Sequence, residues 1–180
     1  MDTAKGQQQP NEPVARRVNE LAGKYLTFVL ANGEYGLAVR KVREIIKLAP
    51  ITAVPQVAPW IKGVINLRGK VIPVVDLRVK FNLSAAEYSD RTCIIVVDMF
   101  VRNSSVLMGI IVDSVSDVMS VAAEELEEAP GFGDWTASSY VDGLAKVKGA
   151  VKILLNVDRV CGSDADLAAF TPSFSTSTSV

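Results

Sequence analysis

Histidine is absent from the 180-residue chain. Its imidazole is the usual general base near neutral pH and the commonest side-chain metal ligand. The absence excludes Ser-His-Asp and Cys-His catalytic sites, although lysine- or aspartate-based chemistry stays open. The composition therefore favours a protein that acts by binding.

Three further scarcities narrow the class of protein. Neither charge sign dominates, because 19 Lys and Arg face 20 Asp and Glu for a net charge of -1. Nucleic-acid binding, which needs a basic surface, is therefore disfavoured. The two cysteines, Cys93 and Cys161, lack the spacing of a metal or redox motif. We expect no metal and no cofactor.

Long apolar runs are also missing. Residues 1–9 are polar and lack the apolar core of a signal peptide, and no apolar run could span a bilayer. We therefore expect a cytoplasmic protein in a reducing compartment. Apolar residues nevertheless make up 49% of the chain, which is ample material for a core.

What the chain has is short β-type segments joined by tight turns. Asn32-Gly33, Arg68-Gly69 and Lys148-Gly149 suit the positive φ values of hairpin turns. Strand pairs are predicted over 25–31 with 34–39, 64–67 with 70–75, 91–98 with 107–113, and 144–147 with 151–156. Such hairpin-linked strands indicate a mainly β fold, either a barrel or a sandwich.

Helices are predicted to be few and short. They are expected over residues 40–45, 77–81, 122–127 and 157–161, and Asp76 and Asn156 are suitable N-caps for the second and fourth. Pro73 lacks an amide donor and predicts an edge position or a bulge in its strand. Polar residues 1–23 and 163–180 are expected to be flexible tails, with a helical stretch near 14–21. One domain then occupies residues 24–162.

The sequence also contains a weak internal duplication. Residues 36–45 (GLAVRKVREI) can be laid over residues 109–118 (GIIVDSVSDV), and the hairpin that begins at Gly63 can be laid over the one that begins at Gly143. The matching elements follow the same order, although short apolar hairpins can resemble one another by chance. We infer two related small barrels with a shared apolar seam. Val42 with Val115, and Glu44 with Asp117, would occupy equivalent places.

Arg68 is the most distinctive polar residue, because it lies in a turn between two apolar strands. An arginine in such a setting suits an interface anchor, since its stem packs while its planar head makes directed hydrogen bonds. A turn arginine that is simply solvated is the plainer alternative. Glu44 is a possible local partner, and an exposed pair of this kind contributes little stability.

Several segments together resemble the CheW-like domain family. They are residues 34–37 (EYGL), 42–45 (VREI), 61–78 (IKGVINLRGKVIPVVDLR), 109–118 and 152–158 (KILLNVD). The resemblance covers residues 24–161, and its most specific part is the asparagine-leucine-arginine-glycine turn followed by a proline-containing strand.

The resemblance implies two SH3-like five-stranded β-barrels around a common hydrophobic core. It also implies a non-catalytic adaptor that couples the histidine kinase CheA to methyl-accepting chemoreceptors in membrane-associated arrays. Carried over by position, the receptor-facing residues are Val42, Glu44, Gly63, Arg68 and Val115. Glu44 and Arg68 could instead orient each other, and kinase contacts are expected only near edge strands. An enzyme or small-ligand binder, and an adaptor serving a different sensory array, are the alternatives.

Overall fold

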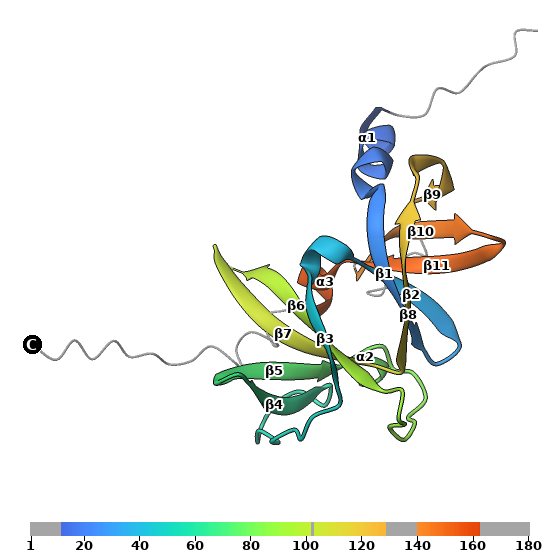
Figure 1. Cartoon of the computed structure of the whole chain (residues 1–180). Coiled ribbons are helices and arrows are strands. Elements are labelled where there is room, and N and C mark those ends of the chain that lie inside the picture. The colour runs from blue at the N-terminus through green and yellow to red at the C-terminus, as the bar shows by residue number, and fades with distance from the viewer. Residues whose placement is uncertain (1–11, 102, 129–139, 163–180) are drawn as a thin grey trace, which may run out of the picture.

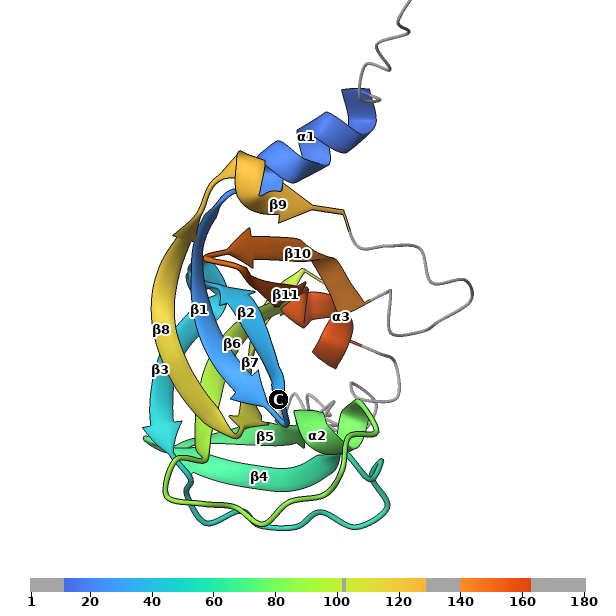
Figure 2. The same ribbon diagram turned by 90° about the vertical axis from the view of Figure 1, so that its right-hand side faces the viewer.

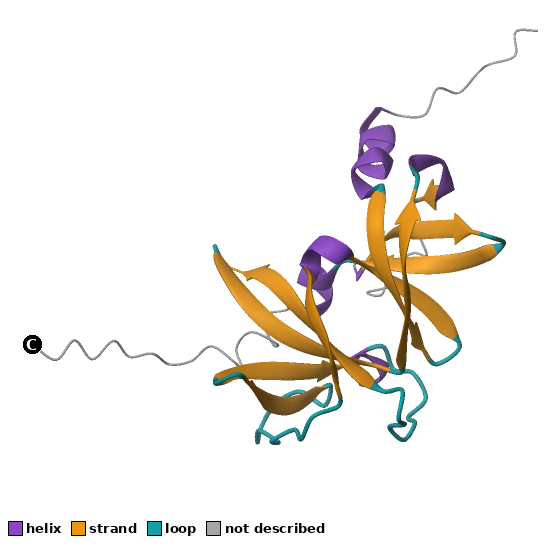
Figure 3. Cartoon of the chain, in the orientation of Figure 1, coloured by secondary structure: helices purple, strands orange, loops and turns teal. Residues whose placement is uncertain are grey.

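Strands make up most of the described chain (Figure 3). The computed structural model describes residues 12–101, 103–128 and 140–162. Its helices are α1 (Glu12–Leu21), α2 (Leu77–Lys80) and α3 (Val157–Cys161). Its strands are β1 (Gly23–Leu30), β2 (Gly33–Ala38), β3 (Val42–Lys47), β4 (Ile61–Leu67), β5 (Lys70–Asp76), β6 (Cys93–Val101), β7 (Ser104–Val112), β8 (Ser114–Val121), β9 (Leu126–Glu127), β10 (Val141–Val147) and β11 (Ala150–Leu155).

All four predicted strand pairs are present as antiparallel hairpins. Two of the predicted turns have the expected geometry, because Arg68-Gly69 and Lys148-Gly149 all have positive φ. Two of the predicted helices also form where expected. Asp76 caps α2 by accepting a hydrogen bond from the Arg78 amide, and Asn156 caps α3 by accepting one from the Arg159 amide.

The strands form two sheets that exchange one strand each. One sheet has the order β8-β1-β2-β11-β10-β9, and the other has the order β3-β6-β7-β5-β4. Because β3 follows β2 but pairs with β6, and β8 follows β7 but pairs with β1, the chain crosses between sheets at both places. Figures 1 and 2 show the two resulting SH3-like barrels side by side. Five strands were expected for each barrel, and the two-residue β9 is a sixth strand in the sheet that contains β1.

Strand register confirms the internal duplication. Gly36 pairs with Leu154 across a parallel ladder, and Gly109 pairs with Val74 in the same way. The register of β3 against β6 shifts between Val42 and Glu44. The register of β8 against β1 shifts between Val115 and Asp117. The predicted equivalence of Val42 with Val115, and of Glu44 with Asp117, is therefore correct.

Apolar side chains form three clusters, and the largest is shared. Both sheets and both short helices contribute to it, including Phe28, Ile95, Leu77 and Val157. A second cluster around Ile72 and Val96 fills the barrel that contains β4, and a third around Tyr25 and Leu154 fills the other barrel. The shared hydrophobic core expected from the sequence is thus present.

Stacked aromatic rings extend this contact between the barrels. Phe28 stacks on Tyr35, Tyr35 lies against Phe81 and Phe81 stacks on Tyr140, with ring centroids about 6 Å apart at each step. The ammonium of Lys80 lies 5.0 Å from the ring centroid of Trp60 and 5.7 Å from that of Tyr140. Trp60 is half-buried and packs against the shared cluster.

Three local predictions are wrong, wholly or in part. Residues 40–45 do not form a helix, because a 3₁₀ turn over Val39–Lys41 leads directly into β3. Residues 122–127 form a 3₁₀ turn followed by β9. Pro73 lies in β5, an interior strand of its sheet, so the edge alternative fails. The bulge alternative also fails for this strand, because the register shift lies in β4 between Ile61 and Gly63, and Pro73 pairs regularly with Val64.

The helical stretch predicted near residues 14–21 is present as α1. Val18 and Leu21 of this helix pack on the third cluster, and the Leu21 carbonyl accepts a hydrogen bond of 2.5 Å from the Tyr25 hydroxyl. This part of the segment 1–23 is therefore folded onto a barrel. Residues 1–11, residues 163–180 and the connection at 129–139 lie outside the described ranges. Within those ranges, no helix has the length and apolarity needed to cross a membrane.

Two ion pairs tie the short helices to the crossings between sheets. Arg78 of α2 donates to both carboxylate oxygens of Asp113, at 2.7 and 2.6 Å, where β7 passes into β8. Asp158 of α3 pairs with Lys41 at 2.8 Å, where β2 passes into β3. Each carboxylate also accepts a backbone amide, that of Ala31 for Asp113 and that of Phe100 for Asp158.

The first of these pairs makes stability depend on pH. Burial by itself would raise the pKa of Asp113, but the hydrogen bonds from Arg78 and the Ala31 amide lower it below its ordinary value. The stabilisation is complete above the unfolded pKa of about 4 and is lost as pH falls through the lower folded pKa.

Replacement of Asp113 by Asn should therefore lower the free energy of unfolding at pH 7 by on the order of 1–3 kcal/mol. In urea titrations, the difference in free energy of unfolding between wild type and Asp113→Asn should become smaller as pH is lowered towards 3. Asp90→Asn, at an exposed aspartate, is the control and should leave stability nearly unchanged. A difference in free energy of unfolding that stays constant between pH 7 and pH 3 would contradict a stabilising role for ionised Asp113.

Candidate functional site

Arg68 and Glu44 form a bidentate ion pair. Nη1 of Arg68 lies 2.9 Å from Oε1 of Glu44, and Nη2 lies 2.9 Å from Oε2. The side chain of Arg68 is 77% exposed, whereas that of Glu44 is 26% exposed. A pair this exposed contributes little to stability, so its consequence is orientation of the guanidinium.

The local fold explains why Arg68 projects. Arg68 and Gly69 both have positive φ, and the Asn66 side chain accepts a hydrogen bond from the Gly69 amide at 2.9 Å. This turn joins β4 to β5, whereas Glu44 belongs to β3, at the far end of the strand order. The ion pair therefore links the two ends of the sheet, which the strand pairings leave open.

A cavity of about 370 Å³ lies beside this ion pair. Its lining combines apolar side chains, three basic ones and one acidic one, namely Leu67, Ile72, Val96, Leu107, Arg43, Arg68, Lys70 and Glu44. Ile72 and Val96 also belong to the cluster inside this barrel, so the cavity is the mouth of that barrel. An apolar hollow with an oriented guanidinium at its rim suits a partner that carries both apolar and acidic groups.

The other barrel lacks this arrangement. Lys148 occupies the turn position that corresponds to Arg68, and it has the same positive φ. Asp117 corresponds to Glu44, but in the described part of the chain no ion pair joins Lys148 to Asp117, and the Asp117 carboxylate instead accepts the Val118 amide. The oriented arginine is thus particular to one of two similar barrels.

The structure places Val42 and Val115 on the two exchanged strands. Both side chains are half-buried against the shared cluster. Val115 also lines a cleft of about 570 Å³ together with Val29, Arg91, Cys93, Ser114 and Ser116, which belong to both barrels. The cleft therefore lies between the two barrels.

Gly63 is buried and touches other parts of its barrel. Its φ is +141°, and a Cβ there would lie only 2.0 Å from the backbone oxygen of Thr52. The residue lets the segment at Thr52 bridge to Val64 of β4, the strand that leads into the Arg68 turn. The structure thus brings Glu44 and Arg68 together, places Val115 in a separate cleft and leaves Gly63 beneath the surface.

Sequence reasoning missed a set of exposed apolar side chains. Ile45 on β3 and Val118 on β8 are 44% and 51% exposed, and Val71 on β5 and Val151 on β11 are 70% and 51% exposed. Each pair occupies corresponding positions in the two barrels. The internal duplication could have indicated these residues, because it aligns Ile45 with Val118 and Val71 with Val151. Their exposure, however, becomes visible only once the strand register is known.

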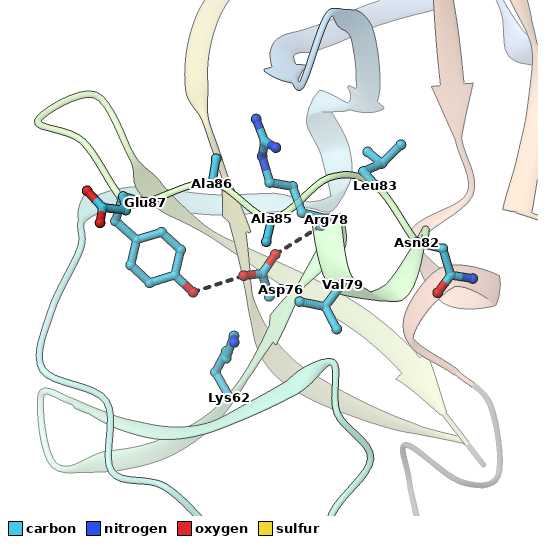
Figure 4. Close-up of a pocket in the computed structure, with 10 residues that line it drawn as sticks. Lys62, Asp76, Arg78, Val79, Asn82, Leu83, Ala85, Ala86 and Glu87 are labelled. Carbon is cyan, nitrogen blue, oxygen red and sulfur yellow. Dashed lines mark hydrogen bonds between the residues drawn. The ribbon is translucent and has the colours of Figure 1, made fainter.

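A larger pocket of about 580 Å³ lies beside α2 (Figure 4). Lys62, Asp76 and Tyr88 are among the residues that line it, and the polar groups of Asp76 and Tyr88 are engaged with each other and with α2. Asp76 caps α2, and the Tyr88 hydroxyl donates to its second carboxylate oxygen at 2.9 Å. Burial, and then this hydrogen bond, raise the pKa of Tyr88 far above neutral pH, so its hydroxyl remains a donor. Nothing in this geometry points to a general base.

Comparison with known proteins decides the family. The family model described as CheW-like domain matches residues 24–165. The chain belongs to the CheW-like domain family. It is 38% identical over 152 residues to the chemotaxis protein CheW of Klebsiella aerogenes, which covers 82% of this chain and 89% of that protein.

A second relative and a solved structure agree. The chemotaxis protein CheW of Bacillus subtilis is 33% identical over 146 residues, covering 81% of this chain and 91% of that protein. The crystal structure of the scaffolding protein TtCheW from Thermoanaerobacter tengcongensis superposes with a TM-score of 0.71 at 31% identity, covering 81% of this chain and 96% of that chain. Membership of a chemotaxis scaffold family is consistent with an adaptor that acts through its surface.

The geometry of Gly63 gives a test of its role. Gly63→Ala should lower the free energy of unfolding by about 3 kcal/mol or more, because its Cβ would meet the Thr52 backbone in a strained conformation. Gly69→Ala, where a Cβ meets nothing within 4 Å, should cost only about 1 kcal/mol for its positive φ. Urea denaturation of both variants measures the difference. Equal stability of Gly63→Ala and Gly69→Ala would overturn this account.

Proposed function

We propose that this protein is a non-catalytic adaptor that couples the histidine kinase CheA to the cytoplasmic tips of methyl-accepting chemoreceptors. The observation that carries the proposal is the exposed Arg68 guanidinium, held by Glu44 at the mouth of one barrel of a CheW-like domain. The proposal places the protein in the cytoplasm, where it joins membrane receptor arrays through its partners.

The receptor-facing surface is proposed to include Val42, Glu44, Arg68 and Val115. Arg68 supplies the anchor, because its 77% exposed head can bond to a carboxylate or carbonyl of a docked helix while its stem lies over apolar side chains. Gly63 contributes by shaping the β4 backbone beneath that anchor. For the kinase we propose a different surface, on edge strands away from the Arg68 turn, so that both partners can bind at once.

Arg68→Glu should reduce co-sedimentation with receptor-containing membranes at least about tenfold, because it removes the anchor and places a negative charge beside Glu44. Binding to the regulatory domain of CheA should stay within about twofold. Lys148→Glu is the matched control, since it makes a related charge change in the equivalent turn of the other barrel. Wild-type membrane binding by Arg68→Glu, or an equal loss in Lys148→Glu, would refute the assignment.

The separate roles of Glu44 and Arg68 can be resolved by Glu44→Gln. If Glu44 only orients the guanidinium, this variant should lose less receptor binding than Arg68→Ala, because a neutral amide can still accept one hydrogen bond. A greater loss in Glu44→Gln than in Arg68→Ala would instead make Glu44 the direct contact.

The sensory pathway is identified by the kinase that the protein captures. A pull-down from the source cells, analysed by mass spectrometry, should recover a CheA-type kinase together with chemoreceptors. Recovery of a kinase and receptors that belong to another array, such as one that controls pili or gene expression, would keep the adaptor role and replace the pathway.

A further inference from the structure

The Arg78–Asp113 ion pair lies next to the segment of β8 that lines the cleft between the barrels. Asp113 immediately precedes Ser114, Val115 and Ser116, three of the residues that line the cleft. Its amide donates to the carbonyl of Val29, which lines the cleft from β1. Whatever holds Asp113 therefore also holds both of these segments of the cleft wall.

Four hydrogen bonds converge on Asp113 from the two barrels. Arg78 of α2 provides two to the carboxylate, the Ala31 amide of the β1–β2 turn provides a third, and the fourth joins the Asp113 amide to Val29. Arg78 is itself held, because its Nη1 donates to the Ser84 carbonyl at 2.5 Å. The side chains of Arg78 and Asp113 are only 16% and 29% exposed. Charge-assisted bonds of this geometry are directional, so they fix position as well as adding stability.

The second crossing repeats the arrangement with the charges reversed. The acid lies on the helix, as Asp158 of α3, and the base lies on the crossing, as Lys41 next to Val42. The carboxylate again accepts a backbone amide, here that of Phe100 in β6, the first strand of the β6–β7 hairpin. Both valines expected at the receptor surface thus lie one or two residues after an ion-paired residue.

We propose that the Arg78–Asp113 pair is a clasp that holds Val115 in the cleft between the barrels, so that Asp113 and Arg78 are positioning residues for the partner that docks there. The docking part rests on the proposed receptor-binding function. The clasp part concerns the shape of the cleft, and it can be measured without any partner.

Cys93 provides the measurement. Its thiol lines the cleft, and burial raises its pKa while a hydrogen bond with the Val115 backbone lowers it in part. A cleft that opens more often should expose this thiol to alkylation. Cys161 is fully buried in the shared cluster and reports opening of the whole protein.

The experiment alkylates the full-length protein with iodoacetamide under native conditions and follows both cysteines by mass spectrometry. Asp113→Asn and Arg78→Gln should raise the rate at Cys93 about tenfold, as expected for the loss of a charge-assisted hydrogen bond. Arg78→Lys, which keeps the charge and loses the bidentate geometry, should fall between them and wild type. Cys93 should also react much faster than Cys161 in every variant, because the rate at Cys161 rises only with the loss of global stability. Asp158→Asn breaks the other pair and should leave Cys93 within about twofold.

Unchanged alkylation of Cys93 in folded Asp113→Asn and Arg78→Gln would overturn the clasp. Alkylation of Cys93 no faster than that of Cys161 would also overturn it, because both thiols would then react only through opening of the whole protein. If Asp113→Asn fails to fold, Arg78→Gln and Arg78→Lys test the clasp by the same two criteria. Receptor co-sedimentation tests the docking part, in which Arg78→Gln should bind at least about threefold more weakly while CheA binding persists. Faster alkylation of Cys93 together with normal receptor binding would overturn the docking part alone. Failure of the proposed adaptor function would instead appear as unchanged receptor binding by Arg68→Glu.

Discussion

The shared apolar cluster is the contact on which the remaining structure depends. Neither sheet covers its own inner surface completely, because β3 and β8 each leave the sheet of the strand before them and complete the other one. The side chains that meet between the sheets, such as Phe28 and Ile95, are fully excluded from water. Burial of this size is the main favourable term in folding, so the two barrels form one cooperative unit.

That unit frees the surface for recognition. The core is held by apolar contacts, and the Arg68 side chain, which is 77% exposed and paired with Glu44, adds little to the stability of the fold. Its positive φ is tolerated because the turn is fixed by Asn66 and Gly69. A rigid turn that displays an oriented cation reduces the entropy lost when a partner binds.

Much of the fold follows from local sequence signals. The hairpins, the two caps and the repeat were predictable because glycine turns and alternating apolar residues act over short distances. The region of Val42 to Ile45 was misassigned as helical. Burial alternates regularly along β3, but Glu44 occupies a half-buried position and Ile45 an exposed one, the reverse of what a strand pattern predicts.

The exchange of β3 and β8 was not predictable in the same way. A duplicated sequence contains two compatible partners for each strand, and local pattern does not say which is used. Of the candidate site, the contact between Glu44 and Arg68 was anticipated as a possibility, and the structure confirms it. The buried setting of Gly63 was not, because it depends on the backbone of Thr52, eleven residues earlier in the chain.

The Arg78–Asp113 and Lys41–Asp158 ion pairs have opposite polarity, with the base on the helix in the first and on the crossing in the second. This difference affects how a duplicated chain can fold incorrectly. Helices α2 and α3 follow corresponding strands and are similar enough to compete for the same crossing. If they changed places, Arg78 would lie beside Lys41, and Asp158 would lie beside Asp113. Each mismatch would put like charges together in a partly buried site, where repulsion is weakly screened. The opposite polarities therefore disfavour an exchange of the two helices, each of which pairs with the crossing in the other half of the duplication.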